Sequence, residues 1–171
     1  MKLSEYLRLS EEQEVTLIGK KISGKIFTAE MSGKPWKGNF VHFDSDLTSL
    51  AGAPSSVGGD FFCYNNNLTS LEGAPSSIGG DIYCNDNKLT SLHDIHKIIK
   101  KMNGEFWVEG NPITSCVLGV LLIEGCIGLV IDNKKVQHIV NKYLPNTRGF
   151  SAVIECQSEL LDASLDEYAK L

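Results

Sequence analysis

Two histidines are the residues of this 171-residue chain whose type and spacing come closest to a metal site. His93 and His96 stand three residues apart with Asp94 between them, which would supply half of such a site. No cysteine or third histidine lies in a suitable register nearby, so we interpret the segment as the polar start of a helix. The sequence therefore predicts no metal site.

The cysteines and glycines give equally little support for catalysis. Cys116, Cys126 and Cys156 would each need a histidine beside them in space to act as nucleophiles, and no local motif indicates such a pair. The glycine pairs at 58–59 and 79–80 recur with a repeat and lack the following helix and lysine of a phosphate-binding loop. We therefore expect a protein that is not an enzyme and that binds no cofactor.

Composition places the chain among folded, acidic proteins. Hydrophobic residues make up 42% and charged residues 22%, and the formal net charge is -5. Binding to nucleic-acid phosphates requires a basic surface, so nucleic acid is not an expected partner. Five cysteines without a disulfide framework fit a reducing cytoplasm. Neither a signal peptide nor a membrane span is expected, because the most apolar run, residues 116–131, contains three glycines and a glutamate.

A period of 21 residues organises the middle of the chain. The tetrapeptide Leu-Thr-Ser-Leu occurs at 47–50, 68–71 and 89–92, and a Gly-Ala-Pro-Ser-Ser-(Val/Ile)-Gly-Gly-Asp linker occurs at 52–60 and 73–81. A fixed period of this length is typical of solenoids, in which each unit buries its apolar face against its neighbours. The chain is therefore expected to be a stack of similar turns.

Residues 61–68 and 82–89 share the pattern apolar-x-apolar-x-x-Asn-x-Leu. This pattern resembles the leucine-rich repeat, and its spacing is most similar to the short bacterial type. The resemblance implies a short parallel strand at the start of each segment. It also implies that Asn66 and Asn87 turn inward, where their amides satisfy backbone groups of the adjacent coil.

The repeat linkers are also similar to those of uncharacterised repeat proteins that large tailed bacteriophages encode. This second resemblance covers the repeats and much of the C-terminal part of the chain. It implies a phage protein in the host cytoplasm that binds and modulates a host factor, such as a component of host defence.

Three segments follow from these observations. Residues 1–38 are expected to form a mixed N-terminal cap, with a helix over residues 1–16. Residues 39–133 are expected to form an α/β, leucine-rich-repeat-like solenoid of about five parallel rungs. Residues 134–171 are expected to form a helical C-terminal cap, because solenoid ends must be covered.

Amphipathic periodicity predicts the helices of the solenoid and of its C-terminal cap. They are expected over residues 94–102, 117–123, 134–144 and 151–171. The apolar stripe of the last helix is expected to consist of Val153, Ile154, Leu160, Leu161, Leu165 and Tyr168.

Alternation along each rung separates side chains that point into the core from those that point to the concave face. The expected inward residues are Phe61, Cys63, Ile82, Cys84, Phe106 and Val108. Phe62, Tyr83 and Trp107 then point outward in a row, with Val41 and Val130 at its ends. Neighbouring parallel strands lie ~4.8 Å apart, so the three rings are expected to form a continuous ladder.

We define the concave face by the three rings and the polar or aromatic residues that flank them. The full set is Phe62, Tyr64, Tyr83, Asn85, Trp107, Glu109, Asp60, Asp81 and Glu105. Exposed aromatic residues beside carboxylates are typical of interaction surfaces, and cation–π contacts favour a basic or amphipathic protein segment. Two alternatives remain open: the face holds a nucleotide or sugar, or the rings only pack on one another or against the N-terminal segment.

Overall fold

The computed structural model describes residues 32–144 and 150–171. The predicted helix over residues 1–16, and the rest of the N-terminal cap up to residue 31, lie outside the described residues. The account below concerns the two described segments.

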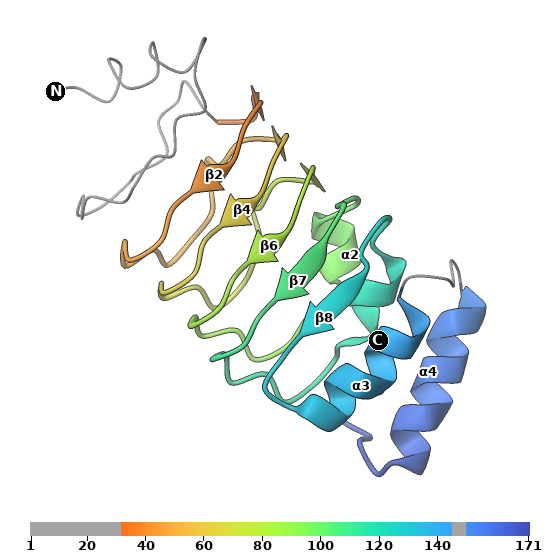
Figure 1. Ribbon diagram of the computed structural model, residues 1–171. Coiled ribbons are helices and arrows are strands. Elements are labelled where there is room, and N and C mark those ends of the chain that lie inside the picture. The colour runs from red at the N-terminus through yellow and green to blue at the C-terminus, as the bar shows by residue number, and fades with distance from the viewer. Residues whose placement is uncertain (1–31, 145–149) are drawn as a thin grey trace, which may run out of the picture.

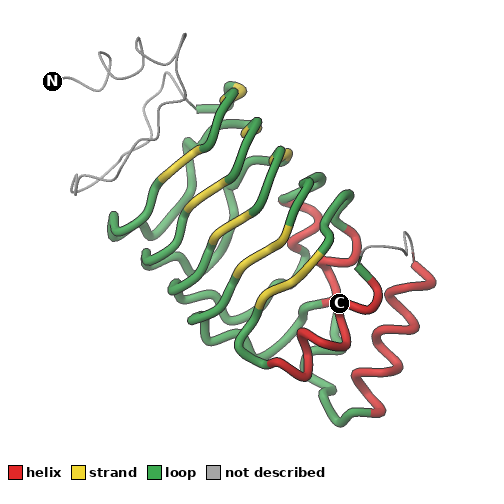
Figure 2. The backbone as a smooth tube through the Cα atoms, viewed as in Figure 1, coloured by secondary structure: helices red, strands yellow, loops and turns green. Residues whose placement is uncertain are grey.

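The chain winds into a solenoid of about five stacked turns, as the 21-residue period predicts (Figure 1; Figure 2). One strand from each turn joins a five-stranded parallel sheet. Its strands are β2 (Phe40–Val41), β4 (Phe61–Phe62), β6 (Ile82–Tyr83), β7 (Glu105–Trp107) and β8 (Gly128–Val130). The register pairs Phe62 with Tyr83 and Tyr83 with Trp107, so equivalent repeat positions lie directly above one another.

The core is formed by the inward positions of the rungs. The predicted inward residues are each at most 1% exposed: Phe61, Cys63, Ile82, Cys84, Phe106 and Val108. In the fifth turn, Cys126, Leu129 and Ile131 are also buried. Alternation along two- and three-residue strands is thus enough to assign the buried side of each turn.

A second parallel sheet of three short strands runs along the linkers. It contains β1 (Pro35–Trp36), β3 (Ser56–Val57) and β5 (Ser77–Ile78). The periodicity does not predict it, because a two-residue strand within a Pro- and Ser-rich linker shows no alternation. Isolated bridges from Ser77 to Lys101 and from Lys101 to Glu124 continue the same pairing into the later turns.

One of the predicted helices is much shorter than expected, and a second is of another type. The segment 94–102 contains only α2 (Ile95–Ile98), and the segment 117–123 contains a 3₁₀ helix, η2 (Leu118–Leu122). The helix of the first segment ends early because the backbone N–H groups of Lys100 and Lys101 donate to Ser76 O of the preceding turn. Stacking on the neighbouring coil therefore replaces the helical hydrogen bonds.

The C-terminal cap consists of α3 (Lys134–Tyr143) and α4 (Phe150–Asp162), which pack side by side at the end of the stack (Figure 1). The predicted helix over 151–171 is wrong in its length, since Ser164 adopts a φ of 57° and Leu165 N–H donates to Leu160 O. The predicted stripe is also wrong in part, because Ile154 and Leu161 are 58% and 48% exposed.

The residue before each inward polar position adopts the left-handed conformation. Asp44, Asn65 and Asp86 have φ values of 51°, 52° and 52°, and Gly110 has a φ of 72°. Aspartate, asparagine and glycine are the residues that tolerate this region best. The two aspartates of this column thus have a conformational role, and Asn65 Nδ2 also donates to Asp44 Oδ1.

Three buried asparagines join each turn to the one before it. Asn66 Oδ1 accepts from Ser45 N at 3.1 Å and from Leu47 N at 3.0 Å. Asn87 Oδ1 accepts from Leu68 N at 3.0 Å, while its Nδ2 donates to Cys63 O and Cys84 O. Asn111 makes the equivalent bonds one turn further on, to Leu89 N, Cys84 O and Val108 O. We call this series of bonded asparagine side chains the amide ladder.

The amide ladder ends at Lys134, which lies in the last turn, 23 residues beyond Asn111. Its Nζ donates to Ile131 O at 3.0 Å, as Asn111 Nδ2 donates to Val108 O. The ammonium group therefore replaces the carboxamide as the donor at the end of the stack.

We predict that Asn87→Ala lowers the free energy of unfolding by at least about 2 kcal/mol. Leu68 N would lose its acceptor in the core, and an unpaired buried polar group costs roughly 1–3 kcal/mol. Asn85→Ala is the matched control in the same turn, since the side chain of Asn85 makes no hydrogen bond within the described residues. Removal of this side chain should change the free energy of unfolding by less than about 0.5 kcal/mol. Urea unfolding of both variants measures the difference, and equal midpoints would contradict the ladder.

Candidate functional site

Phe62, Tyr83 and Trp107 form a stacked row on the outer face of the five-stranded sheet. The Phe62 and Tyr83 ring centroids are 4.7 Å apart with 2° between the planes, and those of Tyr83 and Trp107 are 5.8 Å apart with 26°. All three side chains are half-buried. Val130 at one end is half-buried as well, whereas Val41 at the other is only 7% exposed. The accessible part of the row therefore begins at Phe62.

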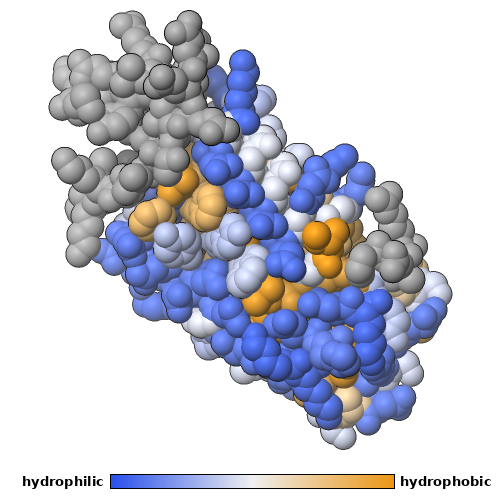
Figure 3. Space-filling view, viewed as in Figure 1, coloured by the Kyte–Doolittle hydropathy of each residue, from blue (hydrophilic) through white to orange (hydrophobic). Residues whose placement is uncertain are grey.

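A second column of outward residues runs beside the row. Phe43 and Tyr64 stack with centroids 4.6 Å apart, and Tyr64 meets the Phe62 ring edge-on at 6.5 Å. Asn85 and Glu109 occupy the same position in the next two turns. In Figure 3 the outer face of the sheet shows a diagonal band of hydrophobic to intermediate residues between hydrophilic borders. The rings do pack on one another, and each also keeps part of its surface accessible.

The acidic residues on the other side of the row form a ladder of their own. Asp60 N donates to Asn39 Oδ1 at 2.9 Å, Asp81 N to Asp60 Oδ1 at 2.9 Å, and Glu105 N to Asp81 Oδ1 at 2.7 Å. Each side chain thus accepts the backbone N–H of the next turn. This carboxylate ladder has a structural role that the sequence analysis did not predict.

The glycine pairs before the strands make room for the carboxylate ladder. A Cβ on Gly59 would lie 2.0 Å from Asn39 Oδ1, and a Cβ on Gly80 would lie 2.0 Å from Asp60 Oδ1. Gly104 stands in the same relation to Asp81, at 2.1 Å. Glycine is therefore required at these positions, since the neighbouring side chain leaves no space for a methyl group.

Tyr83 connects the rings to the acids. Its hydroxyl donates to Asp81 Oδ2 at 2.9 Å. Burial, followed by this hydrogen bond and the negative charges of Asp60, Asp81 and Glu105, raises the pKa of Tyr83 to about 12. The phenol is therefore neutral at physiological pH and lies in a negative field.

Glu109 is the one acid of the concave face that has an ion-pair partner among the described residues. Its Oε1 accepts from Lys134 Nζ at 2.6 Å. Within the same residues, no ion pair involves Asp60, Asp81 or Glu105. The row of rings thus lies beside three carboxylates that have no ion-pair partner among the described residues. At the end of the row nearest the C-terminal cap, the ammonium group of Lys134 pairs with Glu109.

The histidine pair does not gather metal ligands. Asp94 Oδ2 lies 2.6 Å from Lys97 Nζ and 3.5 Å from His93 Nε2. His96 Nδ1 is buried without a hydrogen-bond partner in the described part of the chain. Across residues 32–144 and 150–171, no group of three or more potential ligands is arranged to hold a metal ion.

Four of the five cysteines are buried, which disfavours nucleophilic chemistry. Burial raises the pKa of Cys126 and of Cys156 to about 12, and Cys63 and Cys84 are fully buried. A reactive cysteine needs the opposite, a lowered pKa that yields thiolate. Cys116 is only half-buried, with a φ of 52°.

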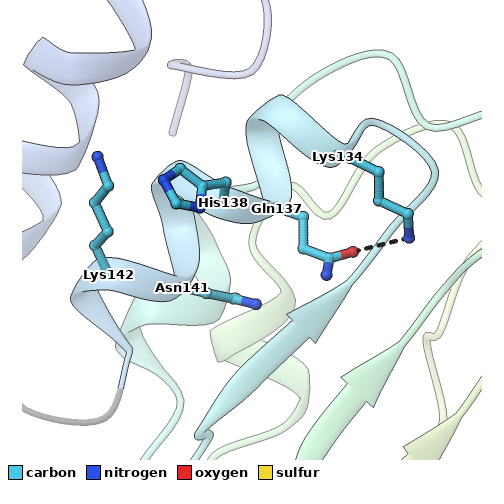
Figure 4. A pocket seen from close by; sticks show the side chains of 5 residues that line it. All are labelled: Lys134, Gln137, His138, Asn141 and Lys142. Carbon is cyan, nitrogen blue, oxygen red and sulfur yellow. Dashed lines mark hydrogen bonds between the residues drawn. The ribbon is translucent and has the colours of Figure 1, made fainter.

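A polar hollow along α3 was not predicted (Figure 4). Its lining consists of Lys134, Gln137, His138, Asn141 and Lys142. Asn141 bonds to both backbone groups of Leu129, and Gln137 Oε1 accepts from Ile131 N at 3.1 Å. These amides close the free edge of β8, and the i, i+4 spacing of Gln137 and Asn141 is the sequence signal that indicates their shared face.

Comparisons with protein-family models, with curated proteins and with solved structures give no match to this chain. The class is therefore defined by the fold alone, a solenoid of about five parallel turns with helices at its C-terminal end. None of the helices in the described segments has the length and apolar character needed to cross a bilayer.

We predict that Gly80→Ala lowers the free energy of unfolding by about 1–3 kcal/mol, the range for overpacking a well-filled site. The new methyl group would displace the Asp60 carboxylate from Asp81 N. Gly38→Ala is the matched control, because no atom of the described residues lies within 4 Å of the added methyl group. Asp60→Ala should partly relieve the clash, so thermal melts of the two single variants and the double variant should show non-additivity. Additive losses would rule out this contact.

We predict that Asp81→Asn lowers the pKa of Tyr83 from about 12 part of the way toward the ordinary tyrosine value near ~10. The substitution removes the negative charge and leaves burial in place. Asparagine can still accept from Glu105 N, as Asn39 accepts from Asp60 N, so the fold should be retained. Tyrosinate absorbance during a pH titration gives the pKa, with Tyr83→Phe identifying the signal, and an unchanged value would exclude the coupling.

Proposed function

We propose that this protein is a non-enzymatic binding module whose concave face takes a basic or amphipathic segment of a partner protein. The observation that carries the proposal is the half-buried row of Phe62, Tyr83 and Trp107 beside carboxylates that have no countercharge in the described residues. Aromatic residues supply large contact area at low entropic cost and dominate binding hot spots.

The electrostatics of the face favour a cationic group. A lysine or arginine over the ring of Tyr83 or Trp107 would gain cation–π attraction, and the nearby acids would strengthen it. Lys134 provides an internal precedent, since its ammonium group already binds Glu109 at the end of the same face. Nucleotide phosphates would be repelled by the same charges.

Two further features support a binding role over a catalytic one. Burial disfavours the thiolate forms of Cys126 and Cys156, and among the described residues the histidines at 93 and 96 have no acid–base partner beyond Asp94. The carboxylates of Asp60 and Asp81 are held by the stack, so the surface is rigid before binding. Preorganisation of this kind reduces the entropy lost on association.

The proposal also includes what the two resemblances of the sequence imply about the type of repeat and the place where the protein acts. The solenoid would be of the short bacterial leucine-rich-repeat type, and the protein would act in the cytoplasm of a phage-infected bacterium by binding a host factor. All five cysteines are unpaired, which supports a reducing compartment. Affinity purification from bacterial lysate with the full chain as bait would identify the candidate partner.

We predict that Tyr83→Ala combined with Trp107→Ala raises the dissociation constant for the partner at least about a hundredfold. Hot-spot aromatics contribute about 2 kcal/mol or more each, and every ~1.4 kcal/mol is tenfold. Titration calorimetry on the purified pair measures the change, while circular dichroism and the melting temperature confirm that the variant is folded.

A second variant tests how much the negative charges of the concave face contribute to binding. Asp60→Asn, Asp81→Asn and Glu105→Gln together remove three negative charges, while the side-chain oxygens that hold the carboxylate ladder are kept. We expect weaker binding and a smaller dependence of affinity on salt. If the partner bound the aromatic and the charge variants as tightly as wild type, the concave face would be excluded. A melting-temperature increase with a nucleotide or sugar would instead favour a small ligand.

A further inference from the structure

The row of rings on the concave face lies between two acidic borders. The first border consists of the acids of the carboxylate ladder. On the other side of the row, Asp44 and Asp86 directly follow the second column of outward residues, and Asp132 takes the place of Glu109 in the fifth turn. We call Asp44, Asp86 and Asp132 the second border. All three are exposed, and none makes an ion pair within the described residues.

The second border lies close to the aromatic part of the face. Burial, followed by the negative charge of Asp44, raises the pKa of Tyr64. The ring of Tyr64 in turn lies 6.5 Å from the ring of Phe62, measured between centroids. Figure 3 accordingly shows the band of hydrophobic to intermediate residues with hydrophilic residues on both sides. A molecule wide enough to cover both columns therefore lies between two rows of negative charge.

The width of the face matches a helix better than an extended segment. Asp60 and Tyr64 are four residues apart along one turn, which corresponds to about 13 Å at ~3.3 Å per residue. A helix with its side chains is roughly 10–12 Å across, so a helix laid along the stack would bring one edge to each border. An extended segment takes up about 4.8 Å, the spacing of neighbouring strands, and reaches one border at most.

The spacing of the acids along the stack favours a helix as well. Each turn of the solenoid adds about 4.8 Å, the distance between neighbouring parallel strands. An α-helix presents the same face again after about 5.4 Å, and an extended segment after about 6.7 Å. Over two turns of the solenoid, the helix therefore departs from the spacing of the acids by about 1 Å and the extended segment by about 4 Å. Cationic residues on successive helical turns can thus meet successive acids.

Two other occupants are disfavoured by the same surroundings. Extended segments are commonly bound by strand addition at a sheet edge, but Gln137 and Asn141 already occupy backbone groups of the last turn, including both of Leu129 in β8. A second copy of the chain, placed face to face, would set acids opposite acids and carries a formal net charge of -5.

We propose that the concave face binds an α-helix of a partner protein that runs along the stack, with apolar residues on the rings and lysine or arginine on both edges. The first border would pair with one edge of this helix and the second border with the other. The inference rests on the function proposed above and adds the form of the segment that the face accepts.

The test uses the full chain and a synthetic peptide of about 14 residues with leucines at helical spacing and lysines elsewhere. Such a helix is about 21 Å long, against ~19 Å from the first to the fifth strand. One control peptide has the same composition with leucine and lysine alternating, and another has proline at two central lysine positions. By fluorescence anisotropy at low salt, we expect the helical peptide to bind at least about tenfold more tightly than either control.

Variants of the two borders test whether the helix spans the face. Asp44→Asn with Asp86→Asn removes two charges from the second border, and asparagine tolerates the left-handed conformation of both positions. Asp60→Asn with Asp81→Asn removes two charges from the first border and keeps the accepting oxygens. We expect each pair of substitutions to weaken binding of the helical peptide at least about fivefold at low salt.

The matched control removes two charges elsewhere on the surface. Glu72→Gln with Asp162→Asn lies outside the concave face, and neither residue makes an ion pair within the described segments. We expect this variant to change the affinity by less than about twofold, because distant exposed charges are screened. Circular dichroism and melting temperatures establish that all variants are folded.

Some outcomes would overturn the helix and leave the binding role intact. The alternating peptide could bind as tightly as the helical one, or the second-border variant could bind the helical peptide as wild type does. No binding of the helical peptide to wild type would have the same meaning, since the partner found by affinity purification tests the binding role separately.

Other outcomes would count against the concave face itself. If Tyr83→Ala with Trp107→Ala bound the helical peptide as tightly as wild type, the peptide would occupy another surface, and both the helix and the proposed function would lose their site. Sedimentation could instead show a dimer that the same ring variant converts to a monomer, in which case a second copy of the chain covers the face.

Discussion

The structure depends on hydrogen bonds from the side chains of one turn to the backbone of the next. Backbone bonds such as Cys63 N to Tyr83 O and Gly79 N to Val57 O join the turns, but the strands are only two or three residues long, so side chains satisfy backbone groups that this pairing leaves over. Asn66, Asn87 and Asn111 do this inside the stack, and Asp60 and Asp81 do it outside. The two ladders require each acceptor to recur at the same height in every turn. This requirement explains why Asn66 and Asn87 are 21 residues apart, and why Asn111 returns to the same position although the next turn is 24 residues long.

The same requirement determines the chemistry of the exposed sheet face. Asp60 and Asp81, which directly precede β4 and β6, each accept the backbone N–H of the next turn, so these two acids line up. The outward residue two positions later must also line up, and aromatic rings at that height stack at 4.7 Å and 5.8 Å. A rigid acidic and aromatic strip thus follows from the stacking rule. A strip held in place in this way fits the binding role proposed above, because preorganisation lowers the entropy lost on association.

Much of this arrangement could be predicted from the sequence, because it is periodic. Phe61 and Cys63 point inward, Phe62 and Tyr83 point outward, and Asn66 and Asn87 are buried, as the alternation and the repeat indicate. The features that were missed depend on contacts between turns. The strand at Pro35–Trp36 is too short for a pattern, and the space that Gly80 leaves for Asp60 is visible only when two turns are superposed. The helical period of 151–171 could not show that Ser164 would reverse the chain, so the buried and exposed faces of α4 were not distinguished.

The last turn shows how the stack is ended. Beyond β8 no further turn is available in the described segments, and Asn141, Gln137 and Lys134 of α3 satisfy the free backbone groups instead. A helix that faces the sheet edge in this way needs its own apolar back covered, and the inner face of α4 covers it through Val153, Cys156 and Leu160. Once α4 has met that need, the described part of the stack places no packing demand on its outer side, where Phe150, Ile154 and Leu161 are exposed. The stack is thus ended by one helix that satisfies the hydrogen bonds of its last turn and a second helix that covers the first.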